Sequence, residues 1–203
     1  MLLELRDVTV EYPTPGRDAS TLKALDHLSL SIGAGEAVCV IGPSGCGKST
    51  ALRLASGLAK PTEGEVLAHG ERITGPRDDC ALILQDYGLL PWMSVYKNAE
   101  LGLSVRGIEK EERRRRTLEA LERVGLAGFE KAWPSELSGG MQQRLALARA
   151  VAMQADLLLM DEPLSALDAL LREDMQLMLL RLWNEGGYGQ LLVTHSIEEA
   201  VLL

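Results

Sequence analysis

The stretch that decides the fold reads Gly42-Pro-Ser-Gly-Cys-Gly-Lys48-Ser49-Thr50. It follows the apolar run 37–41, which predicts a buried strand, and it precedes a helical pattern. In this setting glycines let backbone N–H groups form a concave anion site at the positive end of the helix dipole. Lys48 neutralises outer phosphates, and the Ser49 hydroxyl is a magnesium ligand. We predict a phosphate-binding loop, the alternative being a plain glycine-rich turn. Its residues are Gly42, Pro43, Ser44, Gly45, Cys46, Gly47, Lys48, Ser49 and Thr50.

Strand patterns lie on both sides of this loop. Short unbroken apolar runs recur at residues 81–84, 157–160 and 191–193, as does 37–41 before the loop. Such runs are typical of strands that are covered on both faces of a parallel sheet. Nearer the N-terminus, residues 28–32 alternate between apolar residues and serine, which indicates a half-exposed antiparallel sheet.

Helical patterns lie between the strands. Residues 108–126 form an amphipathic segment with Leu118, Leu121 and Val124 on one face. Two further segments repeat apolar residues at steps of three or four, and Gly186 is placed to end the second. We therefore predict an α/β fold with a mainly parallel core sheet and an N-terminal antiparallel β region. The repeating residues are Met141, Leu145, Ala148 and Ala152, and then Leu171, Met175, Met178 and Leu182.

Composition limits the classes of function. The chain has 203 residues, of which 46% are hydrophobic and 25% charged, as in a globular protein with one sizeable core. A net charge of -8 argues against a nucleic-acid partner, which normally requires a basic face. The one basic run, 113–116, follows Glu109, Glu111 and Glu112 at the four-residue spacing of helix-surface ion pairs. We expect a solvated helix face there.

The cellular compartment can also be predicted. No stretch approaches the roughly 18 to 20 apolar residues of a membrane helix, and the N-terminus reads as a strand rather than a signal peptide. We expect a cytoplasmic protein. Cys39, Cys46 and Cys80 lack metal-like spacing, so we expect reduced thiols, with Cys39 and Cys80 in the core.

Two acids follow the apolar strand 157–160. The carboxyl ends of parallel strands are where ligands of open sheets bind, so Asp161 is placed to hold magnesium through water. Glu162 is placed to polarise a water that attacks the terminal phosphate. The alternative is a solvated acidic turn before Pro163.

These two motifs also fit kinases, GTPases and helicases, but a third motif separates the chain from them. It reads Leu137-Ser138-Gly139-Gly140-Met141-Gln142-Gln143 and opens a helix, which makes it a second phosphate-binding surface. Here the sequence resembles the ATP-binding cassette (ABC) family, whose signature motif is LSGGQ or a near variant. Met141 replaces the usual glutamine, which we do not expect to abolish function. The motifs follow the family's order and spacing over essentially all 203 residues.

The resemblance implies a P-loop NTPase fold and a single ABC nucleotide-binding domain over residues 1–203. The catalytic core is expected at about 1–85 and 155–203, with a helical signature-motif subdomain at 86–154. ATP and Mg²⁺ are the implied cofactors, and ATP hydrolysis is the implied activity.

The resemblance also assigns roles to single residues. Tyr12 corresponds to the aromatic residue that stacks on adenine, and Gln85 to the glutamine that senses magnesium and the terminal phosphate. Asp168 lies in the loop after the catalytic Glu162, and His195 corresponds to a phosphate contact. The full expectation is Glu162, His195 and Gln85 for catalysis, Ser49, Gln85 and Asp161 for the metal, and Tyr12, residues 42–50, Ser138, Gly139, Gly140 and Asp168 for the nucleotide.

Family members work as head-to-tail pairs, in which each ATP lies between the phosphate-binding loop of one chain and the signature helix of the other. A homodimer, or a pair with another ATPase subunit, is therefore expected. ATP closes the pair and hydrolysis reopens it.

The chain carries one cassette without membrane helices of its own and without sustained heptads between Lys48 and Asp161, which fits the separate ATPase subunit of a bacterial importer. Such a subunit lies peripherally at the cytoplasmic face of the inner membrane and reaches a solute-binding protein only indirectly. Residues 85–95 resemble the region that receives a multi-span membrane permease. Their LLPW motif, at residues 89–92, resembles that of the nitrate, sulfonate and taurine group. The alternatives are core packing of Leu89, Leu90 and Trp92, and an ATP-gated regulatory or scaffolding module that is not coupled to transport.

The pattern Ser196-Ile-Glu-Glu199 is a capping box that begins a helix, and the sequence ends at Leu203. Because family members continue with further strands and helices, a truncated C-terminus is expected.

Overall fold

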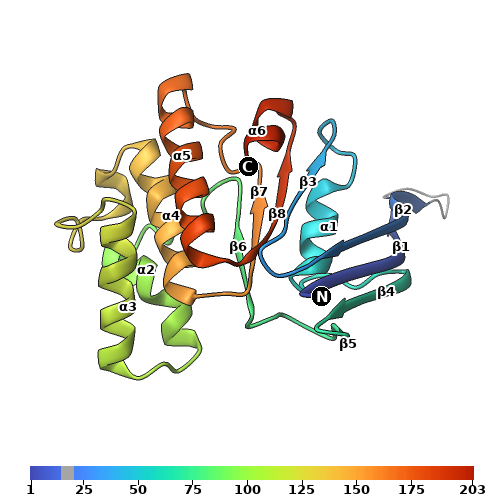
Figure 1. Cartoon of the computed structure of the whole chain (residues 1–203), viewed down its shortest axis with the longest axis horizontal. Helices are drawn as coiled ribbons and strands as arrows, with labels where there is room; N and C mark the ends of the chain where they lie inside the picture. Colours follow the sequence, from blue (N-terminus) through green and yellow to red (C-terminus); the bar gives the residue numbers. More distant parts are fainter. Residues whose placement is uncertain (15–20) are drawn as a thin grey trace.

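The computed structural model describes residues 1–14 and 21–203. Its strands form two sheets, and its helices cover them (Figure 1). The strands are β1 (Leu3–Pro13), β2 (Thr21–Ile32), β3 (Ala37–Ile41), β4 (Glu63–Ala68), β5 (Glu71–Arg72), β6 (Cys80–Ile83), β7 (Leu157–Asp161) and β8 (Gly189–Thr194). The helices are α1 (Lys48–Ala55), α2 (Val95–Val105), α3 (Lys110–Arg123), the 3₁₀ turn η1 (Pro134–Glu136), α4 (Gly139–Met153), α5 (Ala169–Gly186) and α6 (Ile197–Leu202).

The N-terminal sheet is antiparallel, with the strand order β2-β1-β4-β5. Leu3 pairs with Ile32 and Leu5 with Leu30, so the alternating apolar residues of both strands share one face. Leu3, Leu5 and Ile32 are buried there. The predicted N-terminal antiparallel region is confirmed.

The central sheet is parallel, with the strand order β3-β8-β7-β6. Successive residues of β7 serve two different cores: Leu157 and Leu159 pack toward α1 and the N-terminal sheet, whereas Leu158 and Met160 pack toward the helices. This explains why the strand is apolar at every position. The prediction that all of these strands are covered on both faces is wrong for β3, which is an edge strand with Ala37 and Ile41 exposed.

Helix α1 contacts both sheets, while α2, α3 and α4 form the other side of the molecule in Figure 1. The predicted helices around Met141 and Leu171 are confirmed as α4 and α5. Gly186 is the last residue of α5, and Gly187 provides the left-handed cap with φ 61°.

The predicted apolar face of α3 needs a correction. Leu121 is fully buried, but Leu118 is 37% exposed, and Thr117 and Ala120 are buried in its place. The buried residues Thr117, Leu121 and Val124 are spaced by four and three, which follows the 3.6-residue helical repeat more closely than the predicted spacing of three from Leu118.

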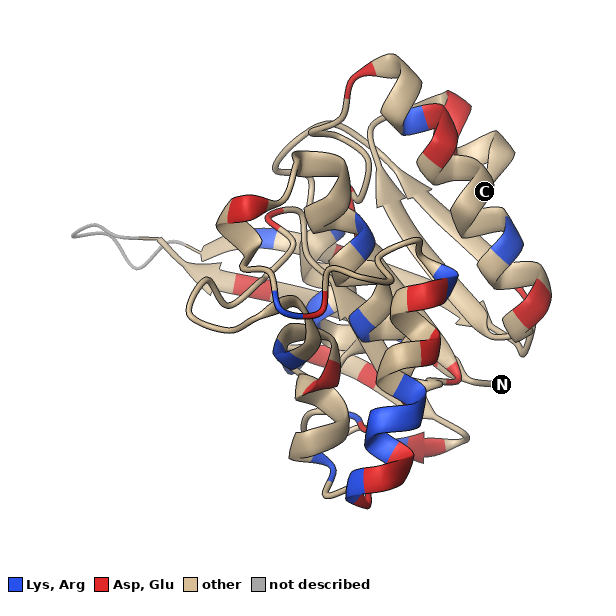
Figure 2. Cartoon of the chain, turned by 90° about the vertical axis from the view of Figure 1, so that its left-hand side faces the viewer, with Lys and Arg blue, Asp and Glu red and all other residues tan. Residues whose placement is uncertain are grey.

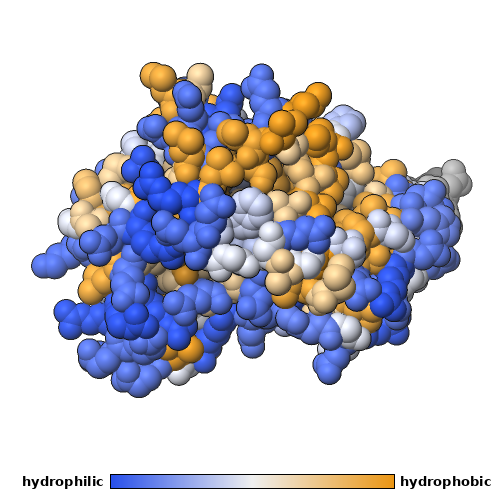
Figure 3. Space-filling model, in the orientation of Figure 1, coloured by the Kyte–Doolittle hydropathy of each residue, from blue (hydrophilic) through white to orange (hydrophobic). Residues whose placement is uncertain are grey.

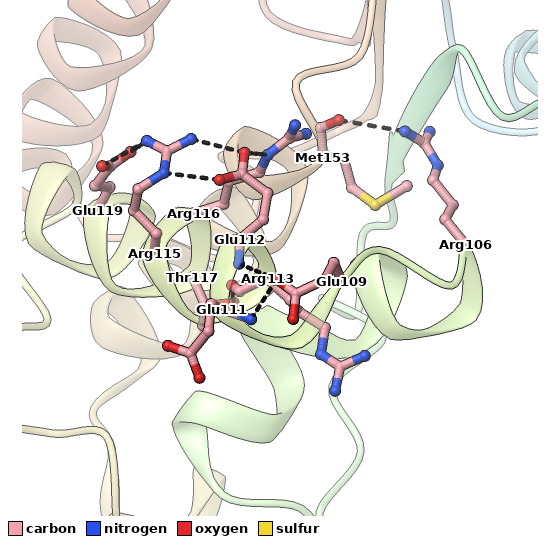
Figure 4. Close-up of polar contacts among 10 residues, drawn as sticks. All are labelled: Arg106, Glu109, Glu111, Glu112, Arg113, Arg115, Arg116, Thr117, Glu119 and Met153. Atoms are coloured by element: carbon pink, nitrogen blue, oxygen red, sulfur yellow. Dashed lines mark hydrogen bonds and ion pairs between the residues drawn. The ribbon is translucent and has the colours of Figure 1, made fainter.

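The basic run 113–116 lies on α3 among acidic partners (Figure 4). Of the three predicted ion pairs only Glu112–Arg116 forms, at 2.6 Å. Glu109 instead accepts the N–H groups of residues 111 and 112 at the helix start, and Arg113 reaches Glu100 on α2 at 2.6 Å. Basic and acidic residues are interspersed over this side of the molecule (Figure 2). Arg114 and Arg115 are exposed, as predicted for a solvated face, whereas Arg113 and Arg116 are half-buried by their ion pairs.

Within the described residues, no helix is both long enough and apolar enough to cross a membrane. Apolar surface gathers over α5 and α6 in Figure 3, where Leu170, Leu177, Ile197 and Val201 are exposed.

Candidate active site

The phosphate-binding loop joins the carboxyl end of β3 to the first turn of α1. Gly45 and Gly47 have φ of 81° and 98°, which side chains with a Cβ rarely adopt. A Cβ on Gly47 would lie 2.1 Å from the Ala24 carbonyl oxygen of β2, and one on Gly42 would lie 2.7 Å from Cys46 Sγ. The tight backbone path therefore depends most on Gly47, where both the positive φ and the neighbouring backbone exclude a side chain.

Lys48 brings its ammonium group to this loop and to the acidic strand end. Its Nζ donates to the carbonyl oxygens of Gly42 at 2.8 Å and Pro43 at 2.9 Å, and lies 3.5 Å from Glu162 Oε1. The Lys48 side chain is 5% exposed and that of Glu162 is 13% exposed. Water screens charges at this depth only weakly, so the site has a strong local field.

Glu162 also contacts His195. The second carboxylate oxygen, Oε2, lies 3.1 Å from His195 Nδ1. Residues from two other motifs, Lys48 and His195, thus converge on the Glu162 carboxylate. Glu162 has a left-handed backbone with φ 45°, and its N–H donates to the Val193 carbonyl oxygen of β8. This bond fixes the turn that directs Glu162 out of the end of β7.

The predicted magnesium ligands lie together. Ser49 Oγ donates to Asp161 Oδ1 at 3.1 Å, which joins the first turn of α1 to the end of β7. A hydroxyl and a carboxylate oxygen at this spacing fit the hard oxygen ligands that Mg²⁺ prefers. The third predicted ligand, Gln85, lies exposed in the turn after β6.

Tyr12 is 38% exposed near the end of β1 and pairs with Leu22 of β2. Ala24, two residues further along β2, is the residue against which Gly47 packs. The N-terminal sheet therefore places Tyr12 beside β2, the strand against which the phosphate-binding loop packs.

The signature motif begins α4 as predicted. Ser138 is the N-cap, and its Oγ accepts the N–H of Met141 at 3.3 Å. Ser138 and Gly139 are exposed, whereas Gly140 packs against Leu171 of α5. Asp168 caps α5 in the same way, since it accepts the Leu171 N–H at 3.0 Å.

Within the described part of one chain, no hydrogen bond or ion pair joins Ser138, Gly139 or Asp168 to the phosphate-binding loop. The exposed start of α4 is therefore a separate group of N–H donors that is available to a second molecule.

Supporting residues that sequence reasoning missed hold these groups in place. Thr194 donates to Glu199 at 2.6 Å and accepts the Ser196 N–H at 3.0 Å, which fixes the turn around His195. The capping-box pattern pointed to Glu199, but its carboxylate binds the threonine rather than the N-cap backbone. Gln143 of α4 donates to the Pro163 carbonyl oxygen, directly after Glu162.

A second group of possible metal ligands, His69, Asp79 and Asp156, has its ligand atoms within 4.8 Å of one another. Asp79 and Asp156 precede the first residues of β6 and β7, so they lie at the sheet edge opposite the phosphate-binding loop. The Arg77 guanidinium binds Asp79 at 2.8 and 2.5 Å and already neutralises it. We assign no metal there.

Comparison with known proteins adds to this geometry. The sequence pattern of the ABC transporter family matches residues 25–165. The chain belongs to the ABC transporter family. It is an ATPase of that family, and the expected ABC resemblance, P-loop NTPase fold and ATP-binding activity are confirmed.

Several curated ABC proteins are similar over most of the chain. The taurine import ATP-binding protein TauB of Burkholderia thailandensis is 50% identical over 182 residues, which cover 90% of this chain and 70% of that protein. The protein of the same name from Roseobacter denitrificans is 45% identical over 201 residues, which cover 99% of this chain and 74% of that protein. These names bear out the resemblance to the nitrate, sulfonate and taurine group.

Solved ABC structures agree in fold. The dimeric structure of the bacterial ABC transporter cassette MJ0796 has a TM-score of 0.86 at 35% identity and covers 98% of this chain and 90% of that one. A post-hydrolysis state of MJ0796 bound to ADP and Pi has a TM-score of 0.85 at 36% identity.

Proposed function

We propose that this chain is the ATP-hydrolysing subunit of a bacterial ABC importer that takes up a small sulfonate such as taurine. The convergence of Lys48 and His195 on the Glu162 carboxylate carries the enzymatic part of the proposal. The names of the relatives, which are 45–50% identical, support import and its substrate class.

In this proposal residues 42–50 surround the ATP phosphates, and Tyr12 stacks on the base. Ser49, Asp161 and Gln85 hold Mg²⁺, which when bound neutralises phosphate charge. Glu162 is the general base that accepts a proton from the attacking water. His195 fixes the orientation of that carboxylate and approaches the terminal phosphate.

We also propose a head-to-tail homodimer, in which the exposed N–H groups at Ser138 and Gly139 bind a phosphate of the ATP that is held in the partner's phosphate-binding loop. Asp168, which caps α5 beside this motif, borders the same interface. The division into a catalytic core (1–85 and 155–203) and a helical subdomain (86–154) remains part of this proposal.

The docking segment, defined as residues 85–95, is proposed to receive a multi-span membrane subunit at the cytoplasmic face of the plasma membrane. Trp92 is 68% exposed, whereas Leu89 and Leu90 are half-buried. An exposed aromatic residue is the kind of anchor that dominates protein interfaces. Core packing thus accounts for the leucines but not for Trp92.

The test is purification of the tagged chain from detergent-extracted membranes, followed by reconstitution in vesicles with its co-purifying membrane subunit and solute-binding protein. We expect ATP-driven taurine uptake that Glu162→Gln abolishes without dissociating the complex. ATP-dependent dimerisation with little turnover and no co-purifying membrane subunit would instead support the ATP-gated regulatory module, which the import names of the relatives do not favour.

A further inference from the structure

The docking segment contains a strained turn. Tyr87 and Gly88 have φ of 64° and 55°, so two successive residues adopt the left-handed conformation. This conformation is costly for tyrosine, and a residue held in it needs support from its surroundings. The local bonds are few: the Tyr87 N–H donates to the Leu84 carbonyl oxygen, and the Gly88 N–H donates to Asp86.

Arg149 of α4 supplies the support from outside the segment. Its Nη1 donates to the Gly88 carbonyl oxygen and its Nη2 to the Tyr87 carbonyl oxygen, both at 2.7 Å. The two carbonyl groups that the left-handed turn brings side by side therefore match the fork of one guanidinium group. More than sixty sequence positions separate the partners.

The side chain of Arg149 is committed to this contact. Burial lowers its pKa, the Asp86 carboxylate opposes that shift from a distance, and among the described residues no carboxylate lies within 4 Å of the guanidinium group. A guanidinium group that loses hydration without gaining an ion pair depends on its hydrogen bonds. The two backbone carbonyl groups of residues 87 and 88 provide them, and among the described residues the Arg149 guanidinium makes no other hydrogen bond.

A second residue fixes the other half of the docking segment. Asn98 of α2 is fully buried, accepts the Leu90 N–H at 2.8 Å and donates to the carbonyl oxygens of Leu90 and Met93 at 3.0 and 2.9 Å. Trp92 is thus held between two anchored stretches while its side chain stays exposed.

Helix α4 connects this segment to the active site. The helix starts at the signature serine, Ser138, and contacts the loop after Glu162 through Gln143. Arg149 lies six residues beyond Gln143, about 9 Å along the helix axis. One rigid element therefore contacts the signature motif, the catalytic loop and the docking segment.

We propose that Arg149 is a positioning residue that ties the docking segment to α4, so that a membrane subunit bound at Trp92 displaces the signature motif and the catalytic loop together. The membrane partner rests on the proposed function, whereas the contact of Arg149 with the turn does not. Lysine at this position keeps the charge but cannot bind both carbonyl groups as a planar fork.

The first measurement is amide hydrogen exchange of the intact chain in Arg149→Lys and Arg149→Met variants. We expect exchange in residues 87–93 to accelerate about tenfold or more, while β8 is unchanged, because the effect is local opening. Arg144→Met is the matched control, since Arg144 lies on the same helix and has no hydrogen bond to the docking segment among the described residues. Unchanged exchange, or equal acceleration in the control, would overturn the proposal.

The second measurement is ATP hydrolysis with and without the co-purified membrane subunit in vesicles. Both Arg149 variants should keep basal turnover and the KM for ATP within about twofold but lose the membrane-dependent stimulation, with Lys no better than Met. Full stimulation in both variants would overturn the coupling role. If the parental chain itself shows no stimulation, the proposed function fails instead, and hydrogen exchange alone decides the role of Arg149.

Discussion

At the scale of single residues, the environment of Glu162 determines what the site can do. The carboxylate lies between the Lys48 ammonium and His195, and its backbone is held in a left-handed turn by β8. The Lys48 ammonium is a donor only, and His195 turns its Nδ1 toward the carboxylate, so we assign the acceptor function for water to Glu162 as a proposal. Removing its charge while keeping its shape tests this directly.

We predict that Glu162→Gln slows steady-state ATP hydrolysis by about two to four orders of magnitude, the usual contribution of a positioned base. The dissociation constant for ATP should change little. Turnover by a coupled phosphate assay and affinity by equilibrium binding check both parts. Glu173→Gln, an exposed change on α5, is the control, and parental turnover in Glu162→Gln would remove the assigned role.

The three cysteines differ in a way that makes Cys46 a selective probe. Burial raises the pKa of Cys39 and of Cys80 to about 11, whereas Cys46 is exposed in the phosphate-binding loop. We predict that maleimide modifies the folded chain once, at Cys46, and abolishes ATP binding, because the added group crowds the phosphates. Prior ATP should protect. Mass spectrometry identifies the modified cysteine. If ATP does not slow the labelling, Cys46 does not lie beside the bound phosphates.

At the scale of elements, Arg77 joins parts of the fold that are distant in sequence. It donates to the carbonyl oxygens of Ala55, at the end of α1, and Leu2, beside β1, and it binds Asp79 before β6. Hydrogen bonding from Arg77 is the main reason that the pKa of Asp79 is lowered from 3.8 to about 2. A carboxylate with a lowered pKa stabilises the fold above its unfolded pKa and loses that effect as the pH falls toward 2.

We predict that Asp79→Asn lowers the free energy of unfolding by about 1 kcal/mol at pH 7, less than the full pKa shift implies because solvent screens this partly exposed pair. The difference from the parental chain should shrink as the pH falls from about 4 to about 2. Denaturant unfolding at several pH values measures it. Asp78→Asn, at the exposed neighbouring position, should have little effect, and a pH-independent loss in Asp79→Asn would rule out the ionised pair as the cause.

At the scale of the whole molecule, the question is whether one chain or two complete the active site. Lys48 and Ser138 are both proposed to bind phosphate, yet no hydrogen bond or ion pair joins their motifs within the described chain. Lys48→Ala and Ser138→Arg should each be inactive, because every site of a homodimer then contains the defect.

We predict that mixing the two variants restores part of the parental ATPase rate. In a mixed head-to-tail dimer one site combines both defects, while the other joins an intact Lys48 to an intact Ser138. Activity titrated against the fraction of mixed dimers measures this. If mixed dimers form without activity, a covalently linked pair of one parental and one Lys48→Ala chain decides the cause. An inactive linked pair indicates that both sites must hydrolyse ATP together. An active linked pair refutes the head-to-tail arrangement.

The sequence by itself determined the features that depend on near neighbours. The loop at residues 42–50 needs glycine where φ is positive, and that requirement is visible in the sequence. The unbroken apolar runs mark strands that are covered on both faces, and the periods of α4 and α5 follow from the repeat of 3.6 residues. The motif residues Lys48, Glu162 and Ser138 could therefore be named, and their elements predicted, before any contact was known.

Only the tertiary structure decided the contacts between distant positions. Local spacing predicted an ion pair for Arg113 with Glu109, but the packing of α2 beside α3 brought Glu100 closer. The bonds of Arg149 to the turn at Gly88, and of His195 to Glu162, likewise join segments that periodicity treats as independent. The reason is physical: a short-range pattern fixes which face a residue occupies, whereas its partner depends on how whole elements pack.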